Sequence, residues 1–279
     1  MPSMGSYKDP LGMRGAEILA IPMDEMVKYF NKALIEGKLP QELITGRTTL
    51  IPKKEDPQLA GDYRPITVLP HITKVLHIVL ANRLKKARIN SCQKGFREVN
   101  GCSENNMVLR NLIGTATDGQ RNFPLAFAFI DLAKAFDSVS HESLLLAARR
   151  VGVPPLNLNH HYENAKTKIG DRDAIFKLGI LQGDPLSGHL FNFVLDWVLD
   201  ITYNTTPIGT RNPVRIGATH VEALLFADDA VLVSKCQQRC QRAAAAGERL
   251  SRVIRKGGVS CKPTEVRIHS DPDGGESPL

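Results

Sequence analysis

The stretch FPLAFAFI, residues Phe123 to Ile130, is apolar at nearly every position, and Asp131 follows it directly. Continuous apolar character over this length favours a central strand buried on both faces over an edge strand. A charge at the end of such a strand is costly unless it is paired or binds a metal. The stretch therefore predicts a sheet inside the fold, with Asp131 at one end of a central strand.

The stretch LLFADDAVLV, residues Leu224 to Val233, places two aspartates in the middle of an apolar run. Strand-forming residues flank Ala227, Asp228 and Asp229, so the pattern predicts a β-hairpin with these three residues in its turn. Tight hairpin turns usually contain glycine because they need positive φ, so a turn without glycine predicts backbone strain. An ordinary surface turn that carries polar residues explains the same stretch at this point.

Helical and extended patterns alternate along the rest of the chain, which predicts an α+β fold. Helices are predicted over Met23–Ile35, ending at Gly37 and Pro40, over Ile72–Ala87, over residues 141–150 after an N-cap at Ser140, and from Pro185 onward. A short strand is predicted in TTLIPKK, where Pro52 ends it. Residues 1–15 and 270–279 are rich in Gly, Pro and Ser, which predicts a disordered N-terminus and a disordered tail.

The length and the charge of the chain bound its class. The 279 residues are 42% hydrophobic, enough for a sizeable core in one large domain or two packed lobes. The formal net charge is +7, and basic residues are concentrated in Lys74–Arg97 and Lys235–Lys262. Either stretch alone is typical of a solvated helix face, but two of them in one chain favour a polyanionic partner.

The cysteine and hydropathy patterns exclude several further classes. Five cysteines at irregular spacing form no disulfide framework, and no Cys or His pair completes a zinc site around Cys236 and Cys240. Reduced, intracellular thiols are therefore expected. No segment reaches ~18 uninterrupted apolar residues, and the first ten residues lack the apolar core of a signal peptide. We therefore expect a soluble protein with no membrane partner.

Three aspartates meet if the apolar strand lies beside the predicted hairpin, although 97 residues separate Asp131 from Asp228. Two carboxylates ~4 Å apart repel by ~4 kcal/mol at an effective dielectric constant of ~20, so three at one place call for divalent cations. Carboxylate oxygens suit Mg²⁺ or Mn²⁺, with substrate phosphates at the remaining positions. Two such ions ~3.5–4 Å apart activate an attacking hydroxyl and stabilise a leaving pyrophosphate, which is the chemistry of nucleotide addition.

A glycine-rich segment, GILQGDPLSGHLFN, lies between the two carboxylate stretches. Its glycines allow close approach of the backbone, and Gln182 offers both a hydrogen-bond donor and an acceptor next to Gly183. Taken alone, the segment is compatible with a simple strand-to-helix connection. The order Asp131, Gln182 with Gly183, then Asp228 with Asp229 is far more specific than any of its members.

The segments DLAKAFDSV, LQGDPLS and FADD resemble, in this order, three palm motifs of reverse transcriptases. Upstream, LIPKKEDPQLAGDYRPITVLP resembles the finger motifs of the non-LTR (LINE-type) retrotransposons, and QKGFREVNGCSEN resembles the template-contacting segment that follows them. Downstream, GERLSRVIRKGGVSCKPTEV resembles the fourth palm motif. The resemblance runs from about Pro22 to Ile268 and is closest to the elements that insert into ribosomal RNA genes.

The resemblance implies the fingers and palm of a right-hand polymerase, with fingers over residues 16–122, a palm over residues 123–269 whose antiparallel sheet carries the carboxylates, and no thumb. It also implies an RNA-directed DNA polymerase domain of a retrotransposon polyprotein, which adds deoxynucleotides to a primer 3′-hydroxyl by two-metal catalysis during target-primed retrotransposition. The implied cofactors are two Mg²⁺ or Mn²⁺ ions. The implied partners are an RNA template, a DNA primer or target, deoxynucleoside triphosphates, and thumb, DNA-binding and endonuclease regions of the same polyprotein, all acting in the nucleus.

Roles for single residues follow from the motif positions that they occupy. The resemblance gives the two metals to Asp131 and Asp228, with Asp229 as a less direct third carboxylate. It makes Phe136 a steric gate against the ribose 2′-hydroxyl, and a core role for the same ring is compatible with that. The remaining implied roles are contacts to the incoming triphosphate for Lys53 and Arg64, to the templating pair for Gln182 and Gly183, and to the template strand for Arg97. Without the resemblance, Lys53 and Arg64 are ordinary solvated loop charges.

Several positions depart from the family pattern. They are Leu181 in place of a basic residue, Gly188 in place of Pro, Phe226 in place of Tyr, and Glu265 in place of the lysine of the fourth motif. With no thumb, zinc finger or endonuclease after them, they keep a second hypothesis open: a truncated or decayed copy that binds RNA or DNA without catalysis. A palm-type nucleotide cyclase shares the carboxylate chemistry but does not explain the finger motifs.

Overall fold

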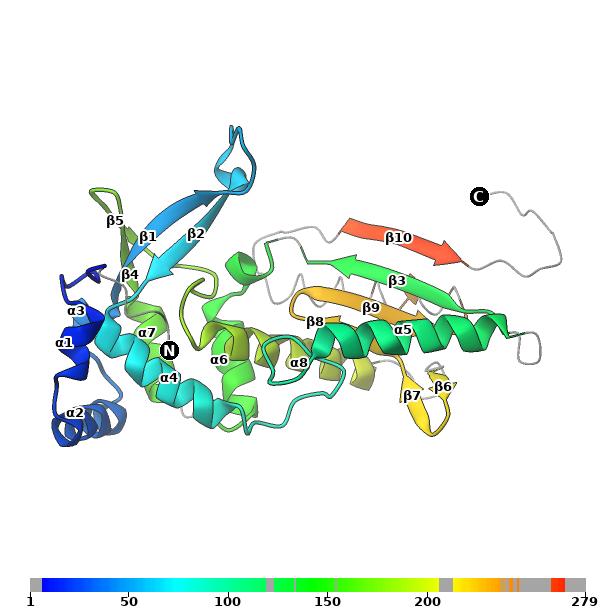
Figure 1. The fold of residues 1–279 in the computed structure, drawn as a ribbon, viewed down its shortest axis with the longest axis horizontal. Helices are drawn as coiled ribbons and strands as arrows, with labels where there is room; N and C mark the ends of the chain where they lie inside the picture. The colour runs from blue at the N-terminus through cyan, green and yellow to red at the C-terminus, as the bar shows by residue number, and fades with distance from the viewer. Residues whose placement is uncertain are drawn as a thin grey trace. The chain divides into compact units, whose positions relative to one another are not determined.

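The computed structural model describes residues 7–118, 123–132, 134–153, 155–205, 213–236, 238, 241–242, 245 and 262–268; for residues 131, 155–157, 202–205 and 262–268 it describes the backbone alone. The chain forms two compact units, Met1–Arg88 with Phe136–Val194 and Ile89–Ala135 with Leu195–Leu279. Each unit combines two segments that lie far apart in the sequence, as the colours of Figure 1 show. We call them the first unit and the second unit.

The first unit contains a four-stranded sheet in the order β2-β1-β4-β5. The strands are β1 (Thr45–Pro52), β2 (Tyr63–Val68), β4 (Lys166–Ile169) and β5 (Arg172–Ile175). β1 pairs antiparallel with β2 and parallel with β4, so the second segment of the unit closes onto the first. The ends of β1 and β2 carry an exposed loop, which projects from the rest of the unit in Figure 1.

Helices of the first unit pack around a core that includes Ile18, Phe30, Ile44 and Leu76. The helices that contribute to this core are α1 (Gly15–Leu19), α2 (Met23–Glu36), α3 (Gln41–Ile44) and α4 (His71–Leu84). The unit also contains α6 (His141–Arg150), α7 (Pro155–Asn164) and the short 3₁₀ turns η1 (Ala60–Asp62) and η2 (Phe136–Ser138). α8 (Ser187–Thr205) begins in this unit and ends in the second.

Local signals in the sequence are confirmed at the helix ends. α2 ends where Gly37 takes the left-handed conformation, with φ 68°. At the start of α6, the Ser140 hydroxyl accepts a hydrogen bond from the backbone N–H of Ser143 at 3.1 Å. α4 ends at Leu84, shorter than predicted.

The N-terminus, predicted to be disordered over residues 1–15, consists of two parts, residues 1–6 and residues 7–15. Residues 1–6 lie outside the described part of the chain, as does the predicted tail over residues 270–279. Asp9, in contrast, is only 2% exposed, and its carboxylate accepts hydrogen bonds from the backbone N–H groups of Leu11, Met13 and His71 at 2.8–2.9 Å. Because His71 is the first residue of α4, Asp9 anchors residues 7–15 to the start of that helix.

The second unit contains an antiparallel sheet in the order β10-β3-β9-β8. Its strands are β3 (Ala126–Asp131), β8 (Ala223–Phe226), β9 (Asp229–Ser234) and β10 (Lys262–Ile268). β3 lies between β10 and β9, which confirms the predicted central strand (Figure 1). Burial on both faces was wrong for Phe129, which is 37% exposed, and the next residue, Ile130, is half-buried.

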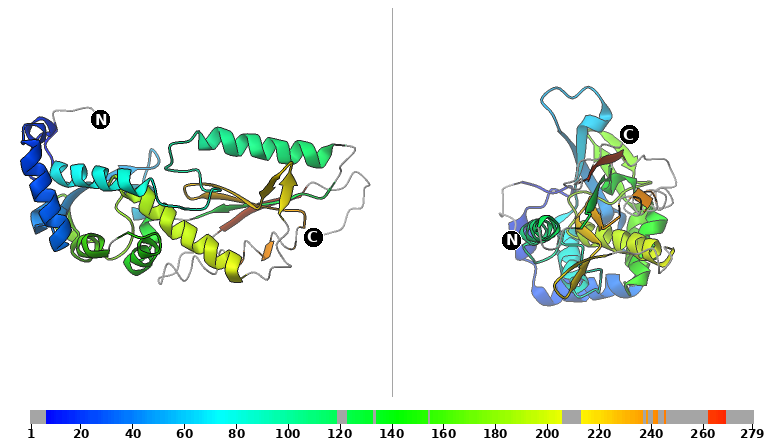
Figure 2. Two further views of the ribbon diagram at one scale, coloured as in Figure 1. Left: turned by 90° about the horizontal axis from the view of Figure 1, so that it is seen from below. Right: turned by 90° about the vertical axis from the view of Figure 1, so that its right-hand side faces the viewer.

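One long helix covers a face of this sheet. α5 (Gly101–Thr117) lies along it in Figure 2 and contributes Leu112 and Ala116 to a core shared with Phe127, Leu224 and Val233. A small hairpin of β6 (Val214–Ile216) and β7 (Thr219–Val221) adds to the same core. None of the helices in the ranges given above is long and apolar enough to cross a membrane.

Candidate active site

Three aspartates occupy one end of the β10-β3-β9-β8 sheet. In the register of β3 and β9, Asp131 is the direct partner of Asp229, and Asp228 precedes Asp229 in the turn. Directly opposed residues of an antiparallel pair have Cα atoms only ~4.5–5.5 Å apart. The predicted meeting of the apolar strand with the aspartate hairpin is therefore confirmed at the level of the backbone. Asp228 is half-buried and Asp229 is exposed.

The turn between β8 and β9 is tighter than predicted. Phe226 pairs with Asp229, so only Ala227 and Asp228 form the loop, and Asp229 already belongs to β9. Ala227 has a φ of 55°, in the left-handed region where a Cβ atom is unfavourable by ~1–2 kcal/mol. The predicted strain of a turn without glycine is thus confirmed and located at one residue.

The donor set fits hard divalent cations in kind. Carboxylate oxygens on neighbouring strands and on the adjoining turn are ligands that Mg²⁺ and Mn²⁺ prefer. Within the described side chains, no group of three His, Cys, Asp or Glu residues is placed to hold a metal, but that set does not contain the side chain of Asp131. The backbone register and the residue types are therefore the observations that favour a metal site here.

A departure from the family motif coincides with an irregularity in the same sheet. The register between β10 and β3 shifts between Thr264 and Val266, so Glu265 has no partner on β3. An extra residue of this kind bends a strand and redirects its neighbours. The position where the fourth motif has lysine is therefore also a bulge in this chain.

Lys53 and Arg64 lie at the end of the β1–β2 hairpin where the connecting loop begins and ends, and both are exposed. Arg64 pairs with Ile51 across the hairpin, and the Lys53 ammonium donates to the carbonyl oxygen of Gly61 at 3.0 Å. Both cations are thus placed on the same arm of the first unit. Their contact with a triphosphate stays a prediction.

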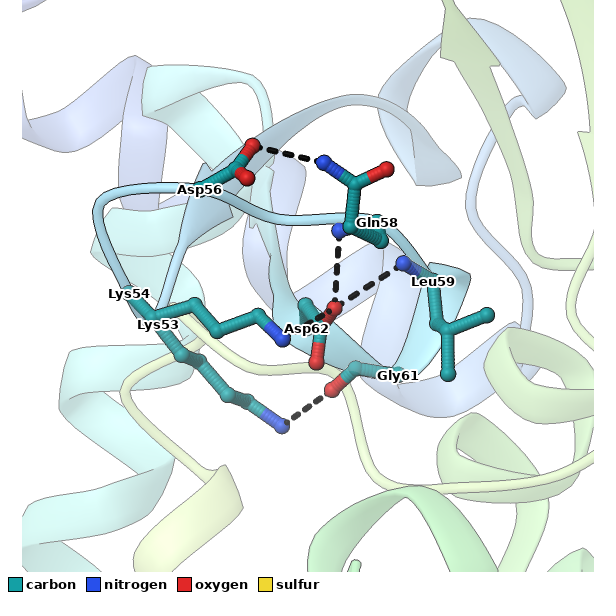
Figure 3. A network of polar contacts seen from close by, with 7 residues as sticks. All are labelled: Lys53, Lys54, Asp56, Gln58, Leu59, Gly61 and Asp62. Carbon is teal, nitrogen blue, oxygen red and sulfur yellow. Dashed lines mark hydrogen bonds and ion pairs between the residues drawn. The ribbon is translucent and has the colours of Figure 1, made fainter.

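A network of polar contacts orders the loop beyond these two cations (Figure 3). Asp62 accepts hydrogen bonds from the backbone N–H groups of Gln58 and Leu59, both at 2.9 Å, and an ion pair of 2.9 Å joins it to Lys54. The hydrogen bond from Leu59, followed by the interaction with Lys54, holds the pKa of Asp62 below its usual value. Asp62 is therefore the centre of a network made within this loop.

Gln182 and Gly183 are fixed against β2. The backbone N–H of Thr67 donates to the Gln182 carbonyl oxygen at 2.8 Å, and the Gln182 amide donates to Asp137 at 2.7 Å. Gly183 has a φ of 105°, and a Cβ atom there would lie 2.7 Å from the Thr67 oxygen. Only glycine fits at this position, which accounts for the LQGD spacing in the structure.

Phe136 is a half-buried residue of the first unit. Its ring stacks on Phe191 at a centroid distance of 4.3 Å and an interplanar angle of 15°. Its carbonyl oxygen accepts a hydrogen bond from the backbone N–H of Ile180 at 2.8 Å. These contacts support the core role, and the role as a steric gate stays a prediction.

A buried polar cluster of the first unit was missed by sequence reasoning. His77 and Asp184 form a hydrogen bond of 2.8 Å, and the His161 ring meets His77 edge to face at 5.1 Å. Burial alone would raise the pKa of Asp184, but His77, together with His161 and the backbone N–H of Leu186, lowers that pKa. Burial, followed by repulsion from His77, lowers the pKa of His161 to about 3. Asp184 stands within the quoted LQGDPLS, but its partner lies 107 residues earlier and gave no signal.

The predicted site residues divide between the two units. Lys53, Arg64, Phe136, Gln182 and Gly183 belong to the first, and Asp131, Asp228, Asp229 and Arg97 belong to the second. Arg97 is exposed, and its guanidinium donates to the carbonyl oxygen of Gln93 at 3.4 Å. Its contact with a template stays a prediction.

Comparison with known proteins gives matches over most of the chain. The model of the family described as reverse transcriptase (RNA-dependent DNA polymerase) matches residues 51–268. The chain is 32% identical over 233 residues to the Pol polyprotein of the type-1 retrotransposable element R2 of Popillia japonica, covering 80% of this chain and 32% of that protein. It is 31% identical over 253 residues to the Pol polyprotein of the type-2 element R2DM of Drosophila melanogaster, covering 86% of this chain and 23% of that protein. The chain thus spans a third or less of the length of these relatives.

Solved structures show the same fold at low sequence identity. Apo telomerase from Candida tropicalis, truncated from its C-terminal domain, matches with a TM-score of 0.56 and 12% identity, over 90% of this chain and 56% of that one. Telomerase of the same species in complex with a fragment of telomeric RNA matches with a TM-score of 0.57 and 11% identity, over 90% and 45%. The α+β fold of this chain is therefore the reverse-transcriptase fold.

Proposed function

The chain belongs to the reverse transcriptase (RNA-dependent DNA polymerase) family, and on this premise we propose that it is the polymerase part of a non-LTR retrotransposon Pol polyprotein. It adds deoxynucleotides to a primer 3′-hydroxyl on an RNA template. One observation carries the proposal: the register of β3 and β9 makes Asp131 the partner of Asp229, beside Asp228 in the turn. A cluster of carboxylates at a sheet end is unfavourable in isolation and useful in phosphoryl transfer.

The carboxylates have a defined task in this reaction. Asp131 and Asp228 would hold two Mg²⁺ or Mn²⁺ ions, with Asp229 in support, and the ions would supply Lewis-acid activation of the primer hydroxyl and charge stabilisation for the leaving pyrophosphate. The sheet would hold Asp131 and Asp229 at a fixed separation, because the register of β3 and β9 makes them direct partners.

Residues of the first unit supply binding and selection. Lys53 and Arg64 bind the triphosphate of the incoming nucleotide, Arg64 through its paired N–H donors and Lys53 as a point charge. Gln182 and Gly183 border the templating base pair, and Phe136 crowds a ribose 2′-hydroxyl. Arg97, in the second unit, contacts the template strand. What supports these roles is the match of each position to the family motifs, and the exposure of Lys53, Arg64 and Arg97.

The rest of the polyprotein belongs to the same proposal. Residues 16–122 act as fingers and residues 123–269 as palm, with β10-β3-β9-β8 as the palm sheet. The thumb, DNA-binding and endonuclease regions are supplied outside this chain, and insertion in the nucleus is primed by a DNA target. The share of the Pol relatives that the chain covers, 32% and 23%, leaves room for such regions.

Primer extension on an RNA template tests the polymerase activity, with the unchanged protein and the double variant Asp228→Asn, Asp229→Asn. Several kcal/mol of transition-state stabilisation depend on the metals, so we expect at least a ~100-fold loss of incorporation. The matched control is Asp171→Asn, Asp173→Asn, which removes two exposed carboxylates from β4–β5 and should leave incorporation unchanged. Equal incorporation by unchanged and Asp228/Asp229 proteins would contradict the proposal, and salt-sensitive RNA binding without incorporation would favour a non-catalytic copy.

A further inference from the structure

The strained turn that carries the aspartates has a buried residue, Ala227, at its first position. Ala227 has positive φ and is buried, so its backbone N–H and carbonyl oxygen need partners away from water. The cross-strand pairing of β8 with β9 ends at Phe226 and Asp229 and does not include Ala227. The side-chain partners that the structure shows for these two groups come from another part of the chain.

Gln93 supplies those groups, although it lies 134 residues before Ala227. Its side-chain oxygen accepts from the Ala227 N–H at 3.0 Å, and its side-chain nitrogen donates to the Ala227 carbonyl oxygen at 3.1 Å. The same oxygen accepts from the N–H of Gly95 at 2.8 Å. An amide is the side chain that offers an acceptor and a donor side by side, and at 2% exposure Gln93 meets little competition from water.

Backbone contacts fix the segment that carries Gln93. The N–H of Leu225 donates to the Cys92 carbonyl at 3.1 Å, and the N–H of Lys94 donates to the Leu225 carbonyl at 2.9 Å, so residues 92–94 form a parallel bridge with β8 at Leu225. The backbone of Gly95 lies directly against Ala227, and an added Cβ atom would lie 2.8 Å from the Ala227 Cα. Gln93 is thus presented to the turn by a strand-like segment with a close backbone approach after it.

We propose that Gln93 is a positioning residue for the aspartate pair: its buried amide holds Ala227 in the conformation that places Asp228 and Asp229 at the end of β3. The peptide of Ala227 leads directly into Asp228, so its orientation sets where the Asp228 side chain begins. Asp229 is fixed on the other side by its pairing with Asp131. The metal-binding consequence of this role rests on the proposed function, whereas the hold on the turn rests on the structure alone.

Hydrogen exchange, followed by mass spectrometry on the peptide over residues 223–234, tests the hold in the 279-residue chain. Gln93→Met keeps the length of the side chain and removes the amide, so three hydrogen bonds are lost and exchange should rise at least ~10-fold. The matched control is Asn105→Leu, which removes a hydrogen bond of 3.1 Å to the Leu225 carbonyl but none to the turn, and its effect at the turn should be small.

Ala227→Gly supplies a second background in which the effect of Gln93→Met on exchange can be measured. Glycine adopts positive φ without penalty, so this turn needs the amide less. Adding Gln93→Met to the Ala227→Gly variant should therefore raise exchange several-fold less than adding Gln93→Met to the unchanged chain. An equal rise in both backgrounds, or no rise in either, would overturn the hold on the turn.

Mn²⁺ binding, measured by electron paramagnetic resonance, separates positioning from a purely structural contact. We expect Gln93→Met to lower Mn²⁺ affinity about 10-fold, Ala227→Gly to restore part of it, and Asn105→Leu to leave it unchanged. Raised exchange with unchanged Mn²⁺ affinity would overturn the positioning role. If Asp228→Asn, Asp229→Asn leaves Mn²⁺ binding of the chain unaltered, the proposed function fails, and raised exchange in Gln93→Met would then mark a contact of the fold alone.

Discussion

The loop that joins β1 to β2 is ordered by its own residues, whereas the turn that joins β8 to β9 is held by Gln93, 134 residues earlier in the chain. In the first, Asp62 gathers Lys54 and the backbone of Gln58 and Leu59, all within nine positions of one another and largely exposed (Figure 3). In the second, every polar contact to Ala227 that we describe is buried.

The difference follows from what each hairpin has to do. Exposed charges at the tip of an arm can exchange partners with water at little cost, so such a loop tolerates local rearrangement. A two-residue turn in a strained conformation cannot stabilise itself, and its backbone groups are costly to leave unpaired away from water. The proposed catalytic turn thus depends on packing between distant segments, and the proposed triphosphate-binding loop depends on sequence neighbours.

The largest expected effect comes from the close approach behind the buried turn. Gly95→Ala would put a Cβ atom against the backbone of Ala227, where neither partner can rotate away. We expect the free energy of unfolding to fall by at least ~3 kcal/mol, at the upper end of overpacking costs, when measured by urea denaturation.

Gly114→Ala is the matched control for that change. Gly114 lies in α5, and an added Cβ atom meets nothing within 4 Å, so alanine should raise the free energy of unfolding by ~0.5–1 kcal/mol. Opposite signs for these two glycines would sharpen the contrast between the held turn and the rest of its unit. Wild-type stability in Gly95→Ala would show that the segment around Gln93 is not packed against Ala227.

A smaller effect on the free energy of unfolding is expected from pH. It arises in the first unit, where the buried His161 titrates, and not at the turn, because the amide of Gln93 does not titrate. Burial lowers the pKa of His161 to about 3, so below pH ~6.5 His161 is protonated in the unfolded state but stays neutral in the folded state. Stability is therefore full above pH ~6.5 and falls as the pH decreases, by ~1.4 kcal/mol per unit for one proton, or ~2 kcal/mol at pH 5. His141, whose pKa burial also lowers, adds a loss of the same sign.

Urea unfolding at pH 7.5 and pH 5 checks this dependence in the unchanged chain and in His161→Leu. The titratable groups that interact with His161 are His77, Asp184, His160 and His141. The pKa of Asp184 is lowered, so the stability that this carboxylate contributes is lost only below the pH range tested. The variant should lose most of the dependence on pH. The β8–β9 hairpin should keep the same hydrogen-exchange protection at both pH values in both proteins, after correction for the intrinsic rate. The reason is that the Gln93 amide, which contacts its turn, is uncharged. A steep loss of protection there at pH 5 would contradict the comparison.

Features that depend on neighbouring residues were predictable from the sequence. Gly37 ends α2, Ser140 caps α6, and a hairpin without glycine is strained, because each outcome is decided within a few positions of the chain. The exposure of Phe129 was not predictable, since an apolar run shows that a strand is inside a sheet but not which of its side chains stay exposed.

The contacts of the candidate site likewise include one that was predicted from the sequence and others that were not. The meeting of Asp131 with the hairpin followed from the two stretches once they were taken as neighbours, and the register confirms it. Gln93 stood in a quoted motif, yet its hydrogen bonds to Ala227 could not be predicted, because a glutamine in sequence carries no information about which distant backbone it will meet. The pair His77 and Asp184 was missed for the same reason.

The smallest expected effect belongs to the exposed loop and completes the comparison. Asp62→Asn removes the ion pair with Lys54 and weakens the acceptor for two backbone N–H groups, so hydrogen exchange over residues 53–62 should rise several-fold while urea unfolding of the chain stays unchanged. Asp56→Asn is the control in the same loop, because Asp56 accepts only from the Gln58 side chain at 2.6 Å among the contacts described. A local response to Asp62→Asn, set against a response to Gln93→Met that appears 134 positions away, is the outcome that separates a self-ordered loop from a held turn. A loss of global stability in Asp62→Asn would show instead that the tip of the arm is as dependent on long-range packing as the aspartate turn.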